Sequence, residues 1–253
     1  MEKENYIYGL RAVIEAVEAG KQIDKVFIKK DLQGELASEL FEILRRNRIL
    51  TMRVPIERIN RITRKNHQGA IAMLSAIEYN RVGNLVPELY EQGRLPLMVA
   101  LDGITDVRNF GAIARTAECC GVDSIIIPER GSVSVGADAV KTSAGALLHM
   151  PVCRERNLAS AIKFLRDNGY QAVAVSEKVD LNYTEADYTI PTVFVMGAED
   201  VGISEEVMRE CNTKVSIPMF GQIQSLNVSV AAGVMMYEAV RQRLQSDMSV
   251  QKD

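Results

Sequence analysis

The sequence predicts an α/β protein of two domains, the second built on a parallel sheet. Short apolar runs alternate with segments of helical periodicity along most of the 253 residues. In the second half these runs are continuous, as in Leu97–Asp102 and Thr192–Met196, which is typical of parallel strands covered on both faces. A polar stretch with Pro, Gly and charge separates the two halves. We therefore expect a first domain at 1–78, a linker at 79–95, a second domain at 96–246 and a disordered tail at 247–253.

The first domain is expected to alternate helices and strands. Apolar residues at helical spacing, ended by Gly20, predict a helix over Tyr8–Gly20. The alternating run KVFIKK predicts a strand over Lys25–Lys30. The remaining elements are expected as helix Glu35–Arg46, strand Leu50–Val54, helix Ile56–Ile62 and strand Ala70–Ala76.

The second domain continues the same alternation. Strand Leu97–Asp102 leads to a helix at Phe110–Cys120, which stops at Gly121. A last strand at Val215–Ile217 ends at Pro218, which cannot donate to a sheet, and a helix follows from Ser225. Between them we expect strand Ser124–Ile127, helix Ala139–Leu148, helix Leu158–Asn168, strand Gln171–Ser176, strand Thr192–Met196 and helix Glu205–Cys211.

Composition argues against several classes of protein. With 47% hydrophobic and 25% charged residues the chain is typical of soluble globular proteins. No apolar run approaches the roughly 18–20 residues of a membrane span, and the N-terminus lacks the apolar core of a secretory signal. The four cysteines form no C-x-x-C pair, which disfavours a zinc site and favours the cytoplasm. Only His67 and His149 are available for a Ser–His–Asp triad, and nothing around them supplies its other parts.

Polar residues gather after three of the predicted strands. Asp102 precedes Asn109–Arg115 (NFGAIAR), and the strand ending at Met196 precedes Gly197–Gly202 (GAEDVG). The third group follows Pro218 and contains Gln222, Gln224, Ser225, Asn227 and Ser229. Because parallel α/β sheets bind ligands at the carboxyl ends of their strands, the three loops are expected to wall one pocket.

Each loop also has a purely structural explanation. Asn109 can cap its helix, Arg115 can pair with Glu118 one turn further on, and the glycines can form turns. No G-x-G-x-x-G follows a strand and no P-loop occurs, which disfavours a nucleotide-dependent oxidoreductase. Amide polarity beside apolar side chains suits an adenine-bearing ligand of modest charge. The apolar residues are Met196, Ile217, Met219 and Leu226.

The three loops, taken in order, resemble the motifs of the SpoU/TrmH family of RNA ribose 2′-O-methyltransferases, in the SPOUT superfamily. The matching segments are NFGAIARTA from Asn109, VMGAEDVGIS from Val195 and IPMFGQIQSLNVSVAA from Ile217. The resemblance implies a parallel-sheet SPOUT domain with a C-terminal trefoil knot, and a homodimer whose active site uses both subunits. The first domain, with YGLRAVIEA and the HQG of His67–Gly69, resembles the ribosomal-protein-like RNA-binding extension of the branch that methylates a guanosine in 23S ribosomal RNA.

The resemblance also implies roles for the site residues. The methyl donor is S-adenosylmethionine, with its adenosine held by backbone groups of Gly197, Ile217 and Leu226 and lined by Met196, Met219 and Gly202. Arg115 matches the family's catalytic arginine. Because a guanidinium holds its proton tightly, we expect it to orient the RNA phosphate and stabilise the developing alkoxide, with a role as base left open. Asn109, Glu199, Ser225 and Asn227 are expected to orient the hydroxyl and shape the loops. No metal is expected, because the sulfonium charge already activates the methyl group.

A basic stretch in the first domain is the expected RNA contact. Glu42–His67 contains 8 Lys and Arg against 2 Asp and Glu, although the net charge of the chain is −3. Such a stretch suits binding to phosphates, and a solvated helix face is the simpler explanation. The residues expected to touch RNA are Arg45, Arg46, Arg58, Arg61, Arg64, Lys65 and His67, of which His67 is equally well explained as a structural turn residue.

Two other functions remain open at this point. The substrate of a methyltransferase of this kind can be a transfer RNA instead of ribosomal RNA. A catalytically inactive, ribosome-assembly RNA-binding protein is the second alternative, and the intact set Asn109, Arg115, Glu199 and Asn227 counts against it.

Overall fold

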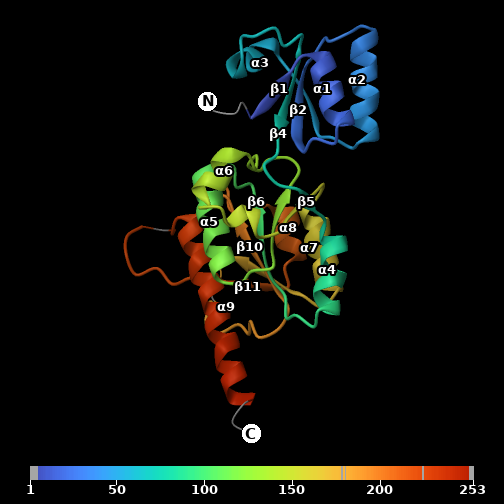
Figure 1. The fold of residues 1–253 in the computed structure, drawn as a ribbon. Helices are drawn as coiled ribbons and strands as arrows, with labels where there is room; N and C mark the ends of the chain where they lie inside the picture. The colour runs from blue at the N-terminus through green and yellow to red at the C-terminus, as the bar shows by residue number, and fades with distance from the viewer. Residues whose placement is uncertain (1–4, 178, 180, 224, 251–253) are drawn as a thin grey trace. The chain divides into compact units, whose positions relative to one another are not determined.

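The computed structural model describes residues 5–177, 179, 181–223 and 225–250, which fall into two compact units (Figure 1). The first unit comprises the described residues up to Glu78 together with Ser134–Asp138, and the second comprises the remainder. The short segment joins the first unit through a hydrogen bond of 2.9 Å from the Ala76 N–H to the Val135 carbonyl.

The first unit is a four-stranded mixed sheet with helices on both faces. Its strand order is β1-β4-β2-β3, with β4 antiparallel to both neighbours and β2 parallel to β3. Alternation along β2 sends Val26 and Ile28 to the α1/α2 face and Phe27 to the α3 face. The bounds are β1 Tyr6–Tyr8, α1 Leu10–Glu18, β2 Ile23–Lys29, α2 Glu35–Arg46, β3 Thr51–Val54, α3 Ile56–Ile62 and β4 Ala70–Leu74.

The second unit is built on a seven-stranded sheet of order β11-β9-β10-β6-β7-β8-β5 in which every pair is parallel. Its strands are β5 Tyr79–Asn80, β6 Leu97–Asp102, β7 Ser124–Pro128, β8 Val152–Glu155, β9 Gln171–Val175, β10 Thr192–Gly197 and β11 Thr213–Val215. Its helices are α4 Val82–Glu91, α5 Val107–Cys119, α6 Ala137–Thr142, the 3-10 turn Ala146–Leu148, α7 Leu158–Asp167, α8 Glu205–Glu210 and α9 Val228–Val250.

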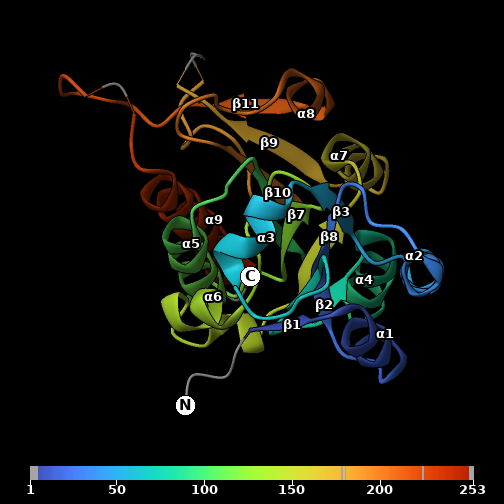
Figure 2. The same cartoon turned by 90° about the horizontal axis from the view of Figure 1, so that it is seen from above.

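Helices cover both faces of this sheet, as its continuous apolar strands require. Helices α4, α7 and α8 lie on one face, and α5, α6 and α9 lie on the other (Figure 2). Helix α6 approaches α5 closely because residue 111 is glycine: a Cβ there would lie 2.3 Å from Thr142 Oγ1. The glycine of the NFGAIAR motif therefore has a packing role.

The segment 79–95, expected as a linker, is part of the second unit. Tyr79 and Asn80 pair with β8, and α4 buries Val82, Leu85, Val86 and Leu89 against α7. Its Pro and Gly residues favoured a linker with one helical turn at most, at Leu85–Tyr90, whereas the structure has a helix of 10 residues here. The expected tail also differs, because α9 continues to Val250, while 251–253 lie outside the described residues.

Other elements differ from expectation in length or presence. The helix expected at Ala139–Leu148 breaks where Ala144 and Gly145 adopt φ angles of 51° and 89°, values that end an α-helix. Strands β1 and β8 were not anticipated, since each is only three or four residues long. Within the described parts of the chain, no helix combines the length and apolar character that crossing a membrane needs.

The C-terminal half of α9 is held at the amino ends of β6 and β10. The Arg243 guanidinium donates to four backbone carbonyls, at distances of 2.8–3.1 Å, those of Leu95, Pro96, Tyr188 and Ile190. The preceding residue, Gln242, accepts a hydrogen bond from the Tyr188 N–H and donates one to the Ala186 carbonyl. These contacts fix the direction of α9. Its N-terminus lies at the carboxyl ends of β6 and β10, next to Glu199.

Candidate active site

The three predicted loops meet around the carboxyl ends of β6 and β10. Asp102 and Gly197, the last residues of the two strands, are directly paired in the sheet. After β6 the sheet is extended on one side by β7 and β8, and after β8 it is extended on the other side by β9, β10 and β11. The strand order therefore reverses between β6 and β10. Open α/β sheets bind ligands at such a point. The Asp102 carboxylate accepts a hydrogen bond of 2.7 Å from the Ser204 N–H, which anchors the loop after β10.

Gly197 is required by close approach of backbone. A Cβ at this residue would lie 2.2 Å from the Gly202 carbonyl carbon and 2.3 Å from the Ile203 nitrogen. The loop folds back because the Gly202 N–H donates to the Ala198 carbonyl at 2.8 Å, and Gly202 itself has a φ of 70°. The absence of a side chain at Gly197 is therefore what lets the loop fold back on the end of β10, and contact of this backbone with a donor stays a prediction.

One hydrogen-bonded network joins the three motifs. The Glu199 carboxylate accepts from the Asn227 side-chain amide at 2.6 Å and from the Asn109 side-chain amide at 3.3 Å. The Asn227 amide also donates to Asn109 Oδ1 at 3.0 Å. Residues 109, 199 and 227 come from loops up to 118 positions apart in sequence. Their assembly supports the prediction that the three loops form one site.

The same residues order the start of α9. The Val228 N–H donates to Glu199 at 3.3 Å, and Asn227 caps the helix by accepting from the Ser229 N–H. A carboxylate is stabilised at a helix N-terminus by the free N–H groups and the helix dipole. Glu199 thus accepts hydrogen bonds from both asparagines and from the first N–H of α9.

The structural explanation for Asn109 was that it caps α5, and the structure shows that it does not. The cap is Asp106, whose carboxylate accepts from the N–H groups of Asn109 and Arg108. These backbone hydrogen bonds, that of Asn109 first, lower the pKa of Asp106. The side chain of Asn109 is left available for the network with Glu199.

Arg115 stands apart from this network. It lies six residues beyond Asn109, or about 240° around the helix axis, and its side chain is exposed. Within the described residues it forms neither the expected pair with Glu118 nor any other hydrogen bond or ion pair. The geometry therefore leaves its guanidinium open to a partner from outside the chain.

The remaining predicted donor residues lie at different depths. Met196 is buried in β10, and Ile217 and Leu226 are half-buried. Met219 and Ser225 are exposed on the loop between β11 and α9, which projects from the sheet in Figures 1 and 2; Gln224 lies outside the described residues. Contact of these side chains with a donor stays a prediction.

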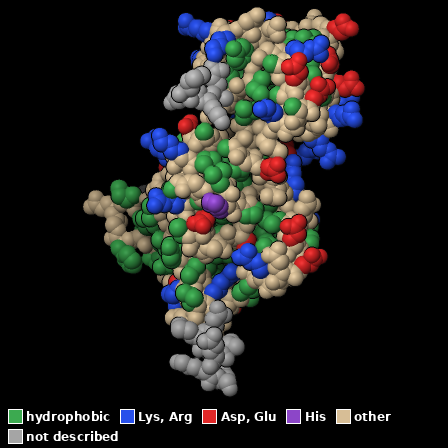
Figure 3. All heavy atoms as spheres, in the orientation of Figure 1, with side chains coloured by type: hydrophobic (Ala, Val, Ile, Leu, Met, Phe, Trp, Pro, Cys, Tyr) green, Lys and Arg blue, Asp and Glu red, His purple; other side chains and the backbone are tan. Residues whose placement is uncertain are grey.

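The basic stretch of the first unit is divided between two faces of its sheet. Arg45 and Arg46 end α2, whereas Arg58 and Arg61 belong to α3, which packs on the opposite face. On the side seen in Figure 3, Lys and Arg lie at several separate places on the first unit. The basic residues of this stretch are therefore distributed over both faces of the sheet, and their contact with RNA stays a prediction.

His67 is occupied within its own turn. Its Nδ1 accepts from the Gly69 N–H at 3.0 Å, so Nε2 carries the proton and donates to Asn60 Oδ1 at 2.9 Å. The neighbouring Gln68 accepts from the Leu10 N–H at the start of α1. The HQG motif accordingly braces α1 and α3, which favours the structural explanation of His67.

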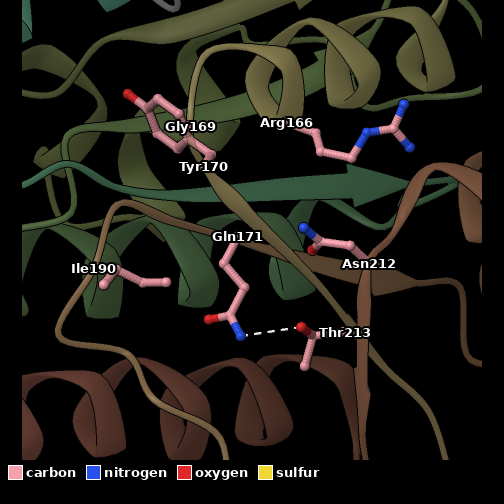
Figure 4. Close-up of a pocket in the computed structure, with 7 residues that line it drawn as sticks. All are labelled: Arg166, Gly169, Tyr170, Gln171, Ile190, Asn212 and Thr213. Atoms are coloured by element: carbon pink, nitrogen blue, oxygen red, sulfur yellow. Dashed lines mark hydrogen bonds between the residues drawn. The ribbon is translucent and has the colours of Figure 1, made fainter.

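A cavity lies at the other edge of the second sheet, near the amino ends of β9 and β11. Figure 4 shows its lining residues, Arg166, Gly169, Tyr170, Gln171, Ile190, Asn212 and Thr213. Arg166 is paired with Glu210 at 3.1 Å, and the Gln171 amide donates to Thr213 at 3.0 Å. Since Gly197 is at the far end of β10, this cavity is separate from the predicted donor site.

Comparison with known proteins decides the family. A model described as "SpoU rRNA Methylase family" matches residues 96–237, and one described as "RNA 2'-O ribose methyltransferase substrate binding" matches 6–80. The chain belongs to the SpoU rRNA methylase family. It is 38% identical over 241 residues to a "Putative TrmH family tRNA/rRNA methyltransferase" of Staphylococcus saprophyticus, covering 95% of this chain and 97% of that protein.

Two solved structures of the SpoU/TrmH type are similar. An AdoMet-bound rRNA methyltransferase from Sinorhizobium meliloti has a TM-score of 0.59 and 28% identity, covering 93% of this chain and 86% of that one. A TrmH/SpoU tRNA modifying enzyme of A. aeolicus has a TM-score of 0.55 and 31% identity, covering 65% of this chain and 87% of its own. The predicted α/β fold with a SPOUT domain is thereby confirmed, while the trefoil knot stays a prediction. This SpoU family member is an RNA 2′-O-methyltransferase with S-adenosylmethionine as methyl donor.

Proposed function

We propose that this protein transfers a methyl group from S-adenosylmethionine to the 2′-hydroxyl of a guanosine in 23S ribosomal RNA. The observation that carries the proposal is the hydrogen-bonded network of Asn109, Glu199 and Asn227. It joins three family motifs at the carboxyl ends of β6 and β10. The substrate-binding match at 6–80 supports an RNA substrate, and the description of the family matched at 96–237 favours ribosomal RNA. The guanosine and the 23S assignment rest on the resemblance of YGLRAVIEA and the HQG turn to one branch of the family.

The geometry suggests a role in the reaction for each group of site residues. The bound donor supplies a methyl group activated by its sulfonium charge. Gly197 and the Gly202 turn offer backbone groups to hold that donor, and the Glu199–Asn227 pair fixes the neighbouring loop. Most of the rate enhancement in such a reaction comes from holding the two reactants in line. Arg115, which has no partner among the described residues, is placed to bind the RNA phosphate and stabilise the developing alkoxide.

A homodimer is part of the proposal. Val230, Tyr237 and Leu244 recur every seventh residue on α9, and their side chains are 51%, 55% and 58% exposed. Residues at that spacing share one helix face, and the opposite face of α9 packs on α5 and β10. Pairing two copies through this outer face would cover the apolar stripe. The active site would then use residues of both subunits, as the resemblance implies.

Transfer RNA is the alternative substrate. The staphylococcal relative is named for both tRNA and rRNA, so its name does not discriminate. The A. aeolicus tRNA modifying enzyme matches only 65% of this chain, whereas the substrate-binding model accounts for residues 6–80. An inactive assembly factor is disfavoured because the three-motif network is intact. We place the reaction in the cytoplasm, consistent with the four free cysteines.

The decisive experiment is transfer of labelled methyl from S-adenosylmethionine to unmodified 23S ribosomal RNA and, in parallel, to transfer RNA. A single labelled 2′-O-methylguanosine in 23S RNA is the expected product. Arg115→Ala should abolish transfer while donor affinity stays within about twofold of wild type. Arg209→Ala is the matched control, since Arg209 is an exposed arginine of the same unit. Labelling of transfer RNA alone, or an active Arg115→Ala protein, would contradict the proposal.

A further inference from the structure

The two faces of the first sheet are covered unequally. Helices α1 and α2 cover one face, and a single seven-residue helix, α3, packs on the other. The α3 face therefore keeps side chains that are only partly buried, among them Tyr6, Tyr8 and Met73. Tyrosine is an amphipathic side chain that commonly serves at binding surfaces in this half-exposed state.

Sheet register places these side chains in two neighbouring rows. Tyr8 pairs with Ile71, which pairs with Phe27, and Tyr6 pairs with Met73, which pairs with Lys25. Because residues two apart on a strand share a face, the Tyr6 and Tyr8 rings stand side by side with centroids 6.2 Å apart. The edge strand β1 thus carries a pair of aromatic rings at the rim of the sheet.

Three cations lie over aromatic rings of this face, one of them over Tyr8. Lys65 Nζ lies 5.5 Å from the Tyr8 ring centre, and the Arg58 guanidinium lies 5.1 Å from that of Phe27. Lys25 Nζ lies 6.0 Å from the Phe27 ring centre. The three cations come from the loop after α3, from α3 and from β2, so the tertiary fold brings them together. The His67 turn, tied to Asn60 of α3, fixes the loop that carries Lys65.

We propose that Tyr6, Tyr8, Arg58 and Lys65, here called the tyrosine platform, bind unpaired nucleotides of the RNA substrate. Bases stack on the two tyrosine rings while the cations neutralise the adjoining phosphates, which is the combination that single-stranded nucleic acid requires. Bases inside a duplex are already stacked and offer no free face. The inference rests on the proposed function, and it specifies that the target lies beside single-stranded RNA.

The other basic residues provide an internal contrast. Arg45 and Arg46 are exposed on α2, on the opposite face from the tyrosine platform. Phe41, the aromatic residue on that side, is partly buried in the α1/α2 core, and the Arg53 guanidinium lies 4.8 Å from its ring centre. Contacts on that side would be to phosphates only, and such contacts do not distinguish single strands from duplexes by stacking.

The test uses the full-length protein and two RNA probes of equal length. One is a single strand with 2-aminopurine at its centre, whose fluorescence falls on stacking, and the other is the same strand in a duplex. Tyr6→Leu/Tyr8→Leu should weaken single-strand binding about tenfold or more and remove the quenching. Tyr6→Phe/Tyr8→Phe, which keeps both rings, should bind as wild type. The single variant Tyr6→Leu serves if the double variant has a disturbed fold by circular dichroism.

Charge variants separate stacking from phosphate contact. Arg58→Gln/Lys65→Gln should reduce the slope of log affinity against log salt by about 1.4, at roughly 0.7 per phosphate contact in a single strand. The leucine variants should leave that slope unchanged. Arg45→Gln/Arg46→Gln is the matched charge control and should leave the quenching unchanged.

Two results would overturn the tyrosine platform. One is a leucine variant, correctly folded, that binds and quenches the single strand like wild type. The other is a phenylalanine variant that loses as much affinity as the leucine variant. Methyl transfer by the wild-type protein is measured separately: transfer without platform binding refutes only this inference, and platform binding without transfer refutes only the proposed function.

Discussion

Gly197→Ala is the substitution for which the structure gives the sharpest expectation. The new Cβ would lie 2.2 Å from the Gly202 carbonyl carbon, 2.3 Å from the Ile203 nitrogen and 2.5 Å from the Gly202 oxygen. Ordinary contacts at a Cβ are 3.4–4 Å, so the Gly202–Ile203 backbone must retreat by about 1 Å. All three atoms belong to backbone, and no side-chain rotation can relieve the overlap.

Overpacking of this kind costs about 1–3 kcal/mol in the free energy of unfolding. For a chain of this size, that corresponds to a fall in melting temperature of about 2–12 °C. The retreat also displaces the turn that the donor is proposed to contact, and a misplacement of about 1 Å in a site can cost up to about a hundredfold. We expect donor affinity to fall at least about tenfold in isothermal titration calorimetry with S-adenosylhomocysteine.

Gly221→Ala is the matched control for this experiment. Gly221 lies on the neighbouring loop, and a Cβ there would meet nothing within 4 Å. Its variant should melt between the wild-type temperature and about 4 °C above it, because no contact is forced and alanine lowers the entropy of the unfolded chain. A Gly197→Ala protein with wild-type melting temperature and donor affinity would refute the argument from close approach.

Three further predictions concern stability. Arg243→Met should lower the free energy of unfolding by about 3 kcal/mol in urea titration, because four backbone carbonyls lose a charged donor; the exposed Arg156→Met is its control, and equal midpoints would contradict this role. A chain starting at Tyr79 should unfold cooperatively, whereas a chain starting at Arg94 should not. The shorter chain lacks α4, so the apolar surface of α7 that α4 covers becomes exposed. Similar melting curves for the two chains would count against this role of α4. Glu238→Gln should lower the melting temperature at pH 7, and the difference should vanish in acid. The reason is that hydrogen bonds from Arg241 lower the pKa of Glu238, so its contribution is present above the ordinary glutamate range and is lost as pH falls through the folded pKa. A difference that persists at low pH would argue against this linkage.

The regular elements of both units could be predicted from local pattern alone. Helix α2 begins and ends where the periodicity indicates, and β6 coincides with LMVALD. Failures occurred where local composition and packing conflict. Pro87 and Gly83 made α4 look like a linker, yet its apolar residues are buried. Strand β8 contains Arg154, a charged residue that is nevertheless buried. Its guanidinium lies 4.6 Å from the ring centre of Tyr79.

The candidate active site likewise has features that the sequence determined and features that only the tertiary structure showed. The ordered motifs in the sequence determined the family and selected Asn109, Glu199 and Asn227, because each motif is a continuous run of residues. Only the tertiary structure showed that these three share hydrogen bonds, and that Asp106 rather than Asn109 caps α5. Such contacts depend on the pairing of β6 with β10, which local sequence does not encode.

For RNA binding, sequence determined the amount of charge and tertiary structure decided its distribution. Eight basic residues in Glu42–His67 are a property of the chain. Their division between two faces follows from the strand order β1-β4-β2-β3, which places α2 and α3 on opposite sides of the sheet. The tertiary fold also sets Tyr8 beside Lys65, which is 57 residues away in sequence. A sheet brings distant residues together through backbone hydrogen bonds between strands, and those partners are chosen only when the whole core is packed.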